Sequence, residues 1–238
     1  MKILALESSA QTASCAICDK DRVICESSIT AGLTHSQTLM VMVENMFKNA
    51  RQNPSEISAI AVSVGPGSFT GLRIGVSAAK GMTQALKCGC VGVSTLWGLA
   101  KNLEGFDAIA CAVMDARNDQ VYNALFKVGG GKIKRFCKDR ALSIDELESQ
   151  IIQAGFNLPV VLVGDGAKIC FEKMKKFSKF RLAPPNLRLQ RASSVGFCGL
   201  EKIKIEDLDP VETIFPKYLR LSQAERMRNN LKNREGTK

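Results

Sequence analysis

The segment GPGSFTGLRIGVSAAKGM, residues 65–82, follows an apolar run and combines closely spaced glycines with a helical pattern, as phosphate-binding loops do. Its glycines are spaced G-x-G-x-x-x-G, whereas a Rossmann fingerprint requires G-x-G-x-x-G, and Lys80 lies too far into the helix for a P-loop. Ser68 or Thr70 is expected to cap the helix, and free N–H groups at a helix start attract anions in general. The spacing thus excludes the two common nucleotide motifs and leaves a general anion site or a plain helix start.

The same helix carries a strip of mostly small residues at steps of three and four: Gly71, Gly75, Ala78, Ala79 and Met82. Because glycine inside a helix costs about 1 kcal/mol relative to alanine, the strip predicts that another backbone comes close to it. Spacing alone leaves two neighbours open, the chain's own sheet and the helix of a partner. Met40 and Met42 favour the partner, since both are expected off the core face of a helix at 35–50, where methionines suit a docking surface.

Nine cysteines and one histidine are the residues that a metal or redox site would use. Cys15 and Cys18 form a C-x-x-C pair, but the surrounding ASCAIC is typical of an extended strand, in which positions three apart point to opposite faces. His35 lies at a helix start and has no second imidazole to join it at a metal. We therefore expect reduced, mostly buried thiols, no metal site, and a packing role for His35 rather than that of a general base.

Two acidic turns could be mistaken for catalytic or nucleotide-binding groups. Asp115 and Arg117 lie between two expected strands, where such a pair usually fixes a turn by local hydrogen bonds. The run GDGA, residues 164–167, lies at a strand-to-helix turn whose small residues would let a nucleotide ring approach. A tight turn capped by Asp165 is the interpretation that we favour for this run.

Apolar periodicity predicts that each half of the chain contains three strands, a helix, a strand and a helix. In the first half, strands are expected at 2–8, 13–18, 22–29 and 57–64 and helices at 35–50 and 70–86, followed by a strand at 90–93 and a helix at 94–103. In the second half, strands are expected at 108–114, 120–128, 132–137 and the run PVVLVG, and helices after the capping-box pattern at 143–146 and from residue 167. This duplication predicts two α/β lobes, 1–104 and 105–216, each with a mixed sheet flanked by helices, and a basic segment at 217–238.

The composition bounds the class of protein. The length of 238 residues and the hydrophobic share of 45% suffice for a sizeable core. The apolar runs are shorter than the roughly 20 residues that cross a bilayer, and the first residues turn polar too soon for a signal peptide, so we expect a soluble cytoplasmic protein. Half of the net charge of +10 comes from residue 217 onward, where seven Lys or Arg accompany two Glu, and this segment is expected either to touch RNA or to be a solvated chain end.

Seven segments resemble the TsaB family, also called YeaZ, and occur in the order of that family: ILALESS, THSQTL, GPGSFTGLRIGVSAAKG, GVSTL, DARNDQVY, LVGDGA and PKYLR. They extend from residue 3 to about residue 220, and GPGSFTGLRIG and DAR…VY are the most specific. The resemblance implies two duplicated lobes of the actin-like ATPase fold, which is ribonuclease-H-like and also called ASKHA. It agrees with the two lobes expected above.

The resemblance further implies a bacterial, non-catalytic subunit that helps to make threonylcarbamoyladenosine on tRNA. In that family the subunit pairs with TsaD, the related transferase that moves the threonylcarbamoyl group to the adenosine beside the anticodon of tRNAs reading codons that begin with A. The pairing uses helices that correspond here to 35–50 and 70–86, and the same face forms homodimers when the subunit is alone. The ATPase TsaE joins the pair, a separate synthase supplies the carbamoyl-adenylate, and tRNA is met through the complex.

The resemblance and the helical spacing together predict a partner interface on the helices at 35–50 and 70–86. Its residues are Leu39, Met40, Met42, Met46, Gly71, Arg73, Gly75, Ala78, Ala79 and Met82. The positions that resemble nucleotide contacts of actin-like ATPases are Glu7, Ser8, Ser9, Gly164 and Gly166. At Glu7 the superfamily more often has Asp, and the longer side chain places its charge elsewhere, so we interpret this set as a remnant. No cofactor is expected for this chain alone, and a nucleotide at the joint with TsaD is the candidate ligand.

TsaD-like proteins carry a metal-binding H-x-x-x-H pair in a segment shaped like GVNHLEGH, whereas the corresponding segment here is GVSTLWGL. Thr95 and Leu99 occupy the two histidine positions, and neither side chain suits a transition metal. The resemblance therefore implies no catalytic residue and no metal ligand in this chain. The alternative is an independent enzyme, either an actin-like ATP-binding kinase or a metallopeptidase, for which Glu7 and GDGA supply only some of the parts.

Overall fold

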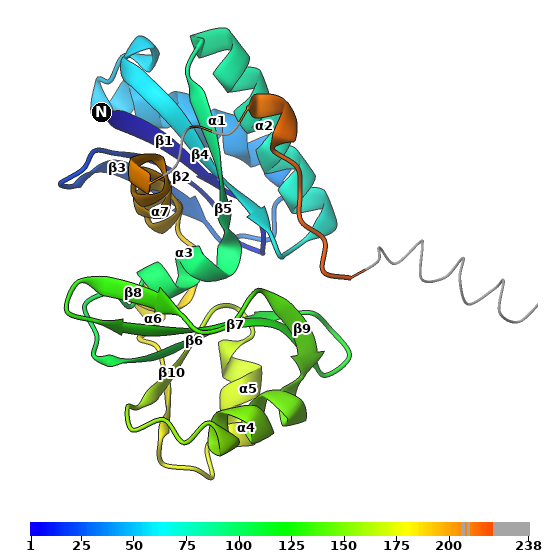
Figure 1. The fold of residues 1–238 in the computed structure, drawn as a ribbon. Coiled ribbons are helices and arrows are strands. Elements are labelled where there is room, and N and C mark those ends of the chain that lie inside the picture. Colours follow the sequence, from blue (N-terminus) through cyan, green and yellow to red (C-terminus); the bar gives the residue numbers. More distant parts are fainter. Residues whose placement is uncertain (206–207, 209, 221–238) are drawn as a thin grey trace, which may run out of the picture.

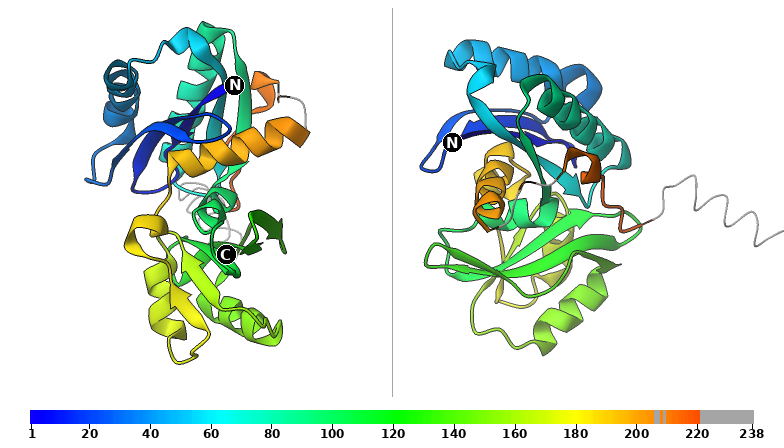
Figure 2. Two further views of the ribbon diagram at one scale, coloured as in Figure 1. Left: turned by 90° about the vertical axis from the view of Figure 1, so that its left-hand side faces the viewer. Right: turned by 45° about the horizontal axis from the view of Figure 1, so that its top comes forward.

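Two β-sheets with helices between and around them form the described part of the chain, which is residues 1–205, 208 and 210–220 of a computed structural model. The layers are, in order, helices α1 (His35–Ala50) and α2 (Phe69–Leu86), the first sheet, helices α7 (Ala192–Ile205) and α3 (Thr95–Lys101), the second sheet, and helices α4 (Ile144–Gln153) and α5 (Ala167–Met174) (Figures 1 and 2). Each sheet is therefore covered on both faces, as a sheet with parallel strands requires.

The first sheet has the strand order β3-β2-β1-β4-β5. Its strands are β1 (Lys2–Glu7), β2 (Ala13–Cys18), β3 (Val23–Ile29), β4 (Ile57–Gly65) and β5 (Gly89–Ser94). Strand β2 is antiparallel to β1 and β3, whereas β1, β4 and β5 are parallel. Because β1 and β4 run in the same direction, the turns that follow Glu7 and Gly65 lie at the same edge of the sheet, where ligands of α/β proteins usually bind.

The second sheet repeats this plan with the order β11-β10-β6-β7-β8, and β9 also pairs with β7. Its strands are β6 (Ala108–Asp115), β7 (Gln120–Gly129), β8 (Lys132–Arg135), β9 (Arg140–Ser143), β10 (Val160–Val163) and β11 (Phe180–Leu182). Strands β6, β10 and β11 are parallel, and β7 is antiparallel to its neighbours. Both lobes thus have a mixed sheet, as the sequence predicts.

The two faces of β2 show why the C-x-x-C pair does not converge. Cys15 lies in the core that α1 and α2 cover, whereas Cys18 lies in the core under α7, on the other face of the sheet. Both thiols are buried, and burial raises the pKa of each to about 12. The prediction that these cysteines point to opposite faces is confirmed.

The elements predicted from periodicity are present at the expected places, and two predicted caps are confirmed. The Ser68 hydroxyl accepts a hydrogen bond from the Gly71 N–H at the start of α2, and Ser143 and Glu146 form a capping box at α4. The structure adds a 3-10 turn at η1 (Pro54–Glu56) and four elements that the sequence analysis did not predict: β9, β11, α6 (Pro185–Arg188) and α7. The first three have only three or four residues each, too few for a periodic signal.

Helix α7 was not predicted because it is apolar on most sides and contains Gly196 and Gly199. A Cβ at Gly199 would lie within 3.0 Å of the Ala61 side chain, so this glycine lets the helix approach the first sheet. The helix packs on β1, β2 and β4, although its residues follow those of the second sheet in the chain. The expected range of 105–216 for the second lobe is therefore corrected at α7, which belongs to the first lobe by its packing.

The end of the described chain returns to the first lobe after α7. The turn η2 (Val211–Thr213) and the buried Ile214 pack beside α2, where the segment is drawn in orange (Figure 1). The Lys217 N–H donates to the Val64 carbonyl at 2.6 Å. Of the basic segment expected at 217–238, residues 221–238 lie outside the described residues. No helix in the described ranges is long and apolar enough to cross a membrane.

Candidate functional site

The turn after β1 packs directly on the start of α2. The Ser68 N–H donates to the Ser9 carbonyl at 2.6 Å, and the Ser8 hydroxyl donates to the Gly71 carbonyl at 2.8 Å. His35, the first residue of α1, joins the same contact through a hydrogen bond of 2.7 Å between its Nε2 and the Ala10 carbonyl oxygen. The start of α2 is therefore held against the chain's own turn by backbone and side-chain hydrogen bonds.

The glycines of this region are required by that close packing. A Cβ at Gly67 or Gly71 would lie within 3.0 Å of a carbonyl oxygen of the turn, and a Cβ at Gly75 would lie equally close to the Ser8 hydroxyl. Contacts this short do not occur for real Cβ atoms, so any side chain here would displace the turn. Of the two neighbours that spacing left open, the chain's own backbone is the one that the strip meets.

Glu7 is a buried carboxylate at this turn, with 1% of its surface exposed. It accepts a hydrogen bond of 2.6 Å from the Ser9 N–H. Burial raises the pKa of Glu7 above the ordinary value of 4.5, the hydrogen bonds from Ser9 oppose that rise, and the negative charge of Asp165 in the second lobe adds to it. The carboxylate is therefore occupied by its own turn.

The turn at 164–166 packs closely against the end of β6. A Cβ at Gly164 would lie within 3.0 Å of the Val113 carbonyl, and one at Gly166 would lie as close to the Asp115 N–H. The small residues at this turn thus let it pack closely against the chain's own β6.

Asp165 does not cap α5, which corrects one part of the prediction for this turn. The N-cap of α5 is Gly166, and no side chain caps the helix. Asp165 instead accepts a hydrogen bond of 2.8 Å from the Gln190 side-chain amide. Burial raises the pKa of Asp165, and the negative charge of Asp115 contributes to that rise.

The pair Asp115 and Arg117 has the structural role that the sequence predicts. The Asp115 carboxylate accepts a hydrogen bond of 2.7 Å from the backbone N–H of Arg117. Arg117, Asn118 and Asp119 all have φ between 55° and 62°, which the tight turn between β6 and β7 requires. Beside this turn, the Arg220 guanidinium donates to the Ala116 carbonyl, which connects the end of the described chain to the second lobe.

The two positions that correspond to metal-binding histidines are Thr95 and Leu99 on α3. Both side chains are only 1% exposed and lie in the core of the molecule. The described residues contain no group of three or more His, Cys, Asp or Glu that could hold a metal ion. Thr95 and Leu99 therefore have a packing role at the start of α3.

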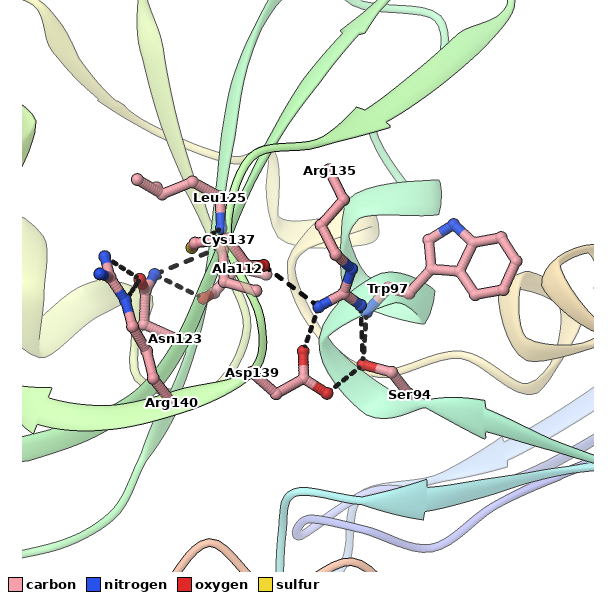
Figure 3. Close-up of polar contacts among 10 residues, drawn as sticks. Ser94, Trp97, Ala112, Asn123, Leu125, Arg135, Cys137, Asp139 and Arg140 are labelled. Carbon is pink, nitrogen blue, oxygen red and sulfur yellow. Dashed lines mark hydrogen bonds and ion pairs between the residues drawn. The ribbon is translucent and has the colours of Figure 1, made fainter. Parts of the chain in front are cut away.

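Ser94, directly before α3, connects the two lobes through a polar network (Figure 3). Its hydroxyl accepts from the Trp97 N–H as the helix cap and donates to the Asp139 carboxylate at 2.7 Å. Arg135 pairs with the same carboxylate at 2.5 Å and donates to the Ser94 hydroxyl at 3.2 Å. Because Arg135 and Asp139 belong to the second lobe, this network fixes α3 against it.

Comparison with known proteins identifies the family. Residues 29–227 match the family model described as TsaD: tRNA N6-adenosine threonylcarbamoyltransferase. The chain is also 30% identical over 227 residues to the tRNA threonylcarbamoyladenosine biosynthesis protein TsaB of Bacillus subtilis (strain 168), a match that covers 94% of this chain and 96% of the relative. The chain belongs to the TsaB/YeaZ family.

Two further matches extend this result. The structure of YeaZ from Pseudomonas aeruginosa has the same fold, with a TM-score of 0.77, 24% identity, and coverage of 92% of this chain and 99% of that one. The two-lobed actin-like fold that the resemblance implies is thereby confirmed. A shorter match of 94 residues, 34% identical, joins 37% of this chain to 27% of the tRNA N6-adenosine threonylcarbamoyltransferase of Bacillus subtilis (strain 168).

The structure corrects much of the interface that was predicted from TsaB/YeaZ resemblance and spacing. Six of its ten residues are buried in the chain's own core or against its own turn: Leu39, Met42, Met46, Gly71, Gly75 and Ala79. They offer no contact area to a partner in this conformation. Ala78 and Met82 are half-buried and pack on the same core, whereas Met40 and Arg73 are exposed.

An exposed residue that sequence reasoning missed is Val41, which follows Met40 on α1 and is 54% exposed, against 44% for Met40. Two adjacent large apolar residues on an exposed helical turn are a signal that could have found it. On the outer face of α2, Arg73 lies over the Phe69 ring at 3.9 Å and donates to the Tyr218 hydroxyl, and Tyr218 stacks on Phe69. Part of the surface of α2 is therefore covered by residues 210–220 of the same chain.

Proposed function

We propose that this chain is a non-catalytic subunit that binds a TsaD-type transferase and supports transfer of the threonylcarbamoyl group to the adenosine beside the anticodon of tRNAs that read codons beginning with A. Relatives named as tRNA threonylcarbamoyladenosine biosynthesis proteins support a role in this pathway. The match to the TsaD family model and to a transferase of that name supports a related transferase as the partner.

The observation that carries the non-catalytic assignment is the burial of Thr95 and Leu99 at the positions where the transferase pattern has its two histidines. A hydroxyl in the core and an aliphatic side chain cannot supply the nitrogen ligands of such a site. The contacts at Ser8–Ser9 and at 164–166 support the same assignment, since these turns pack on the chain's own α2 and β6. In this proposal, the nucleotide that the resemblance implies binds at the joint with the transferase.

The partner surface in this proposal lies on the outer face of α1 and the adjoining part of α2. Met40 and Val41 are the exposed apolar residues of α1, and Leu33, just before the helix, is 55% exposed. Apolar residues that are exposed together usually mark an interaction site. We assign to the same surface the homodimer that the subunit forms alone, so that binding of the transferase and homodimer formation compete, and the ATPase TsaE joins the pair once it has formed.

The test is tRNA threonylcarbamoylation in a reconstituted mixture of the carbamoyl-adenylate synthase, the TsaD-type transferase, the TsaE-type ATPase and tRNA, with and without this chain. We expect modification only when the chain is present, and none when the chain replaces the transferase. Modification at the full rate without the chain would overturn the proposal.

Calorimetry with MgATP and the isolated chain tests the competing assignment of an independent kinase. Since both glycine turns pack on other parts of the chain, we expect no measurable heat of binding. Tight binding with a stoichiometry of one would favour the enzyme instead.

A further inference from the structure

The β7–β8 hairpin carries three exposed lysines on one face of the second sheet: Lys127, Lys132 and Lys134. Lys127 and Lys134 are directly opposite each other in the register of the two strands, and Lys132 is two residues from Lys134, on the same face. Ile133, between them, faces the other way and packs on the core under α3. We call these three lysines the lysine face.

The lysine face is unfavourable for the fold by itself. Like charges at directly opposite positions of two antiparallel strands destabilise the pair. Within the described residues none of the three lysines makes an ion pair, although the nearby Arg135 pairs with Asp139. Asp107 is an acidic residue beside the hairpin turn, where its carboxylate lies close to Gly129, but none of the three lysines pairs with it within the described residues. A local conflict of this kind without compensation is typical of a functional surface.

Protection of a sheet edge explains only part of this arrangement. Strand β8 is an edge strand, and lysines on an edge prevent pairing with other chains. Lys127, however, lies on β7, which is paired on both sides by β6 and β8 and needs no such protection. The charge on the inner strand therefore calls for another reason.

The hairpin is also accessible. Gly130 and Gly131, at the turn, have no other atom within 4 Å of the position that a Cβ would take, so a large ligand could approach the turn (Figure 1). Phe136, just after β8, is 45% exposed, and its backbone N–H bonds to the Leu125 carbonyl, which places it beside the lysine face. Exposed lysines with an exposed aromatic ring are the combination that contacts RNA phosphates and bases.

We propose that the lysine face binds the phosphate backbone of the tRNA on which the complex acts. This inference rests on the proposed function, because that function supplies the polyanion that is present in the complex. A flexible ammonium group on each of three neighbouring positions suits contacts to successive phosphates without sequence readout.

The test compares two triple variants of the full chain in the reconstituted complex. The first is Lys127→Gln with Lys132→Gln and Lys134→Gln. The matched control, Lys173→Gln with Lys175→Gln and Lys176→Gln, removes the same charge from the same lobe, but its lysines are already paired with carboxylates. Both the KM for tRNA and the salt dependence of tRNA binding to the complex are measured.

We expect the lysine-face variant to raise the KM for tRNA about tenfold or more at low salt and to reduce the slope of log K against log salt by about 2 to 3, since each lost phosphate contact contributes about 0.7 to 0.9. The rate at saturating tRNA should stay unchanged, and the control variant should bind tRNA nearly as well as wild type. A variant with arginine at all three positions keeps the charge and should bind tRNA like wild type. The melting temperature of the glutamine variant should stay equal or rise, because repulsion between Lys127 and Lys134 is removed.

Equal losses in the two glutamine variants would reveal a general effect of net charge and overturn the proposal, as would unchanged tRNA binding in both. Loss of binding to vesicles of phosphatidylglycerol without any loss of tRNA binding would assign the surface to a membrane instead and would also overturn it. If the wild-type chain proves dispensable for modification, the proposed function fails. If the chain is required while the lysine-face variant behaves as wild type, only this inference fails.

Discussion

At the scale of single residues, Glu7 shows how the fold has absorbed a position that resembles a nucleotide-binding acid. Its carboxylate is 1% exposed and accepts a hydrogen bond from the Ser9 N–H, so it holds the turn that packs on α2. Burial and the negative charge of Asp165 raise the pKa of Glu7 although the hydrogen bonds from Ser9 lower it, so the ionised form is less favourable in the folded chain than in the unfolded chain.

We predict that Glu7→Gln increases stability at neutral pH. Because the pKa of Glu7 is raised in the folded chain, the folded state binds a proton more readily than the unfolded state, and stability falls as the pH rises above about 4.5 toward the folded pKa. The neutral amide escapes this loss, and each pKa unit of difference is worth about 1.4 kcal/mol.

Urea unfolding at several pH values between about 4 and 8 checks this prediction. The stability difference between Glu7→Gln and wild type should be near zero at the acidic end and grow with pH. The exposed Glu212→Gln serves as the control. A difference that is independent of pH would contradict the raised pKa.

At the scale of elements, the contact between α2 and the turn after β1 determines which glycines the chain needs. Gly71 faces the Ser8 carbonyl, with no room for a Cβ, whereas Gly81, in the same helix, has open space around it. The two glycines lie in the same helix but have opposite structural roles. Glycine is a poor helix former at both positions, but only Gly71 makes a close tertiary contact that excludes a side chain.

We predict opposite effects of alanine at these two positions. Gly71→Ala should lower the free energy of unfolding by about 1 to 3 kcal/mol, because the new methyl group displaces a backbone carbonyl in a closely packed site. Gly81→Ala should raise it by up to about 1 kcal/mol, because alanine is the better helix former and meets no atom. Denaturant unfolding of both variants is the measurement, and a stabilising Gly71→Ala would show that the turn moves away freely.

At the scale of the whole molecule, hydrogen bonds hold the two lobes together near the segments where the chain passes from one lobe to the other. The Asn102 side chain donates to the Leu187 and Leu189 carbonyls, both at 2.8 Å, and accepts from the Ser194 hydroxyl, so it holds the segment that leads back to α7. Ser94 and Arg220 connect the lobes elsewhere. These contacts fix the two lobes against each other, and α1 packs on the first lobe through its own buried face.

We predict that Met40→Asp together with Val41→Asp weakens binding of the TsaD-type transferase by about 2 kcal/mol or more, roughly thirtyfold in Kd, because two carboxylates would lose their hydration in an apolar contact. The matched control is Ile152→Asp with Ile169→Asp, at exposed aliphatic positions of the second lobe. Calorimetric titration of each variant with the transferase is the measurement, and circular dichroism verifies that both fold. Equal affinities for the two variants would remove the face of α1 from the proposed interface.

The sequence was sufficient for most of the secondary structure of the two lobes. Apolar runs and the caps at Ser68 and Ser143 are local signals, and they predicted the helices and strands up to α5 except β9. It was insufficient for α7, because a helix that is apolar on most sides has no periodic face to detect. The short β9 and β11 exist through pairing with β7 and β10, which no local pattern encodes.

The candidate site was also only partly predictable, because its contacts join segments that lie far apart in the chain. By themselves, the residues determined that Cys15 and Cys18 diverge, that Asp115 fixes a turn, and that another part of the chain or a partner must come close to Gly71 and Gly75. Only the tertiary structure decided that this neighbour is the chain's own turn at Ser8, and that Met42 faces inward while Val41 faces outward. The physical reason is that spacing along a helix specifies which residues share a face, whereas the neighbour of that face depends on segments that lie far apart in the chain.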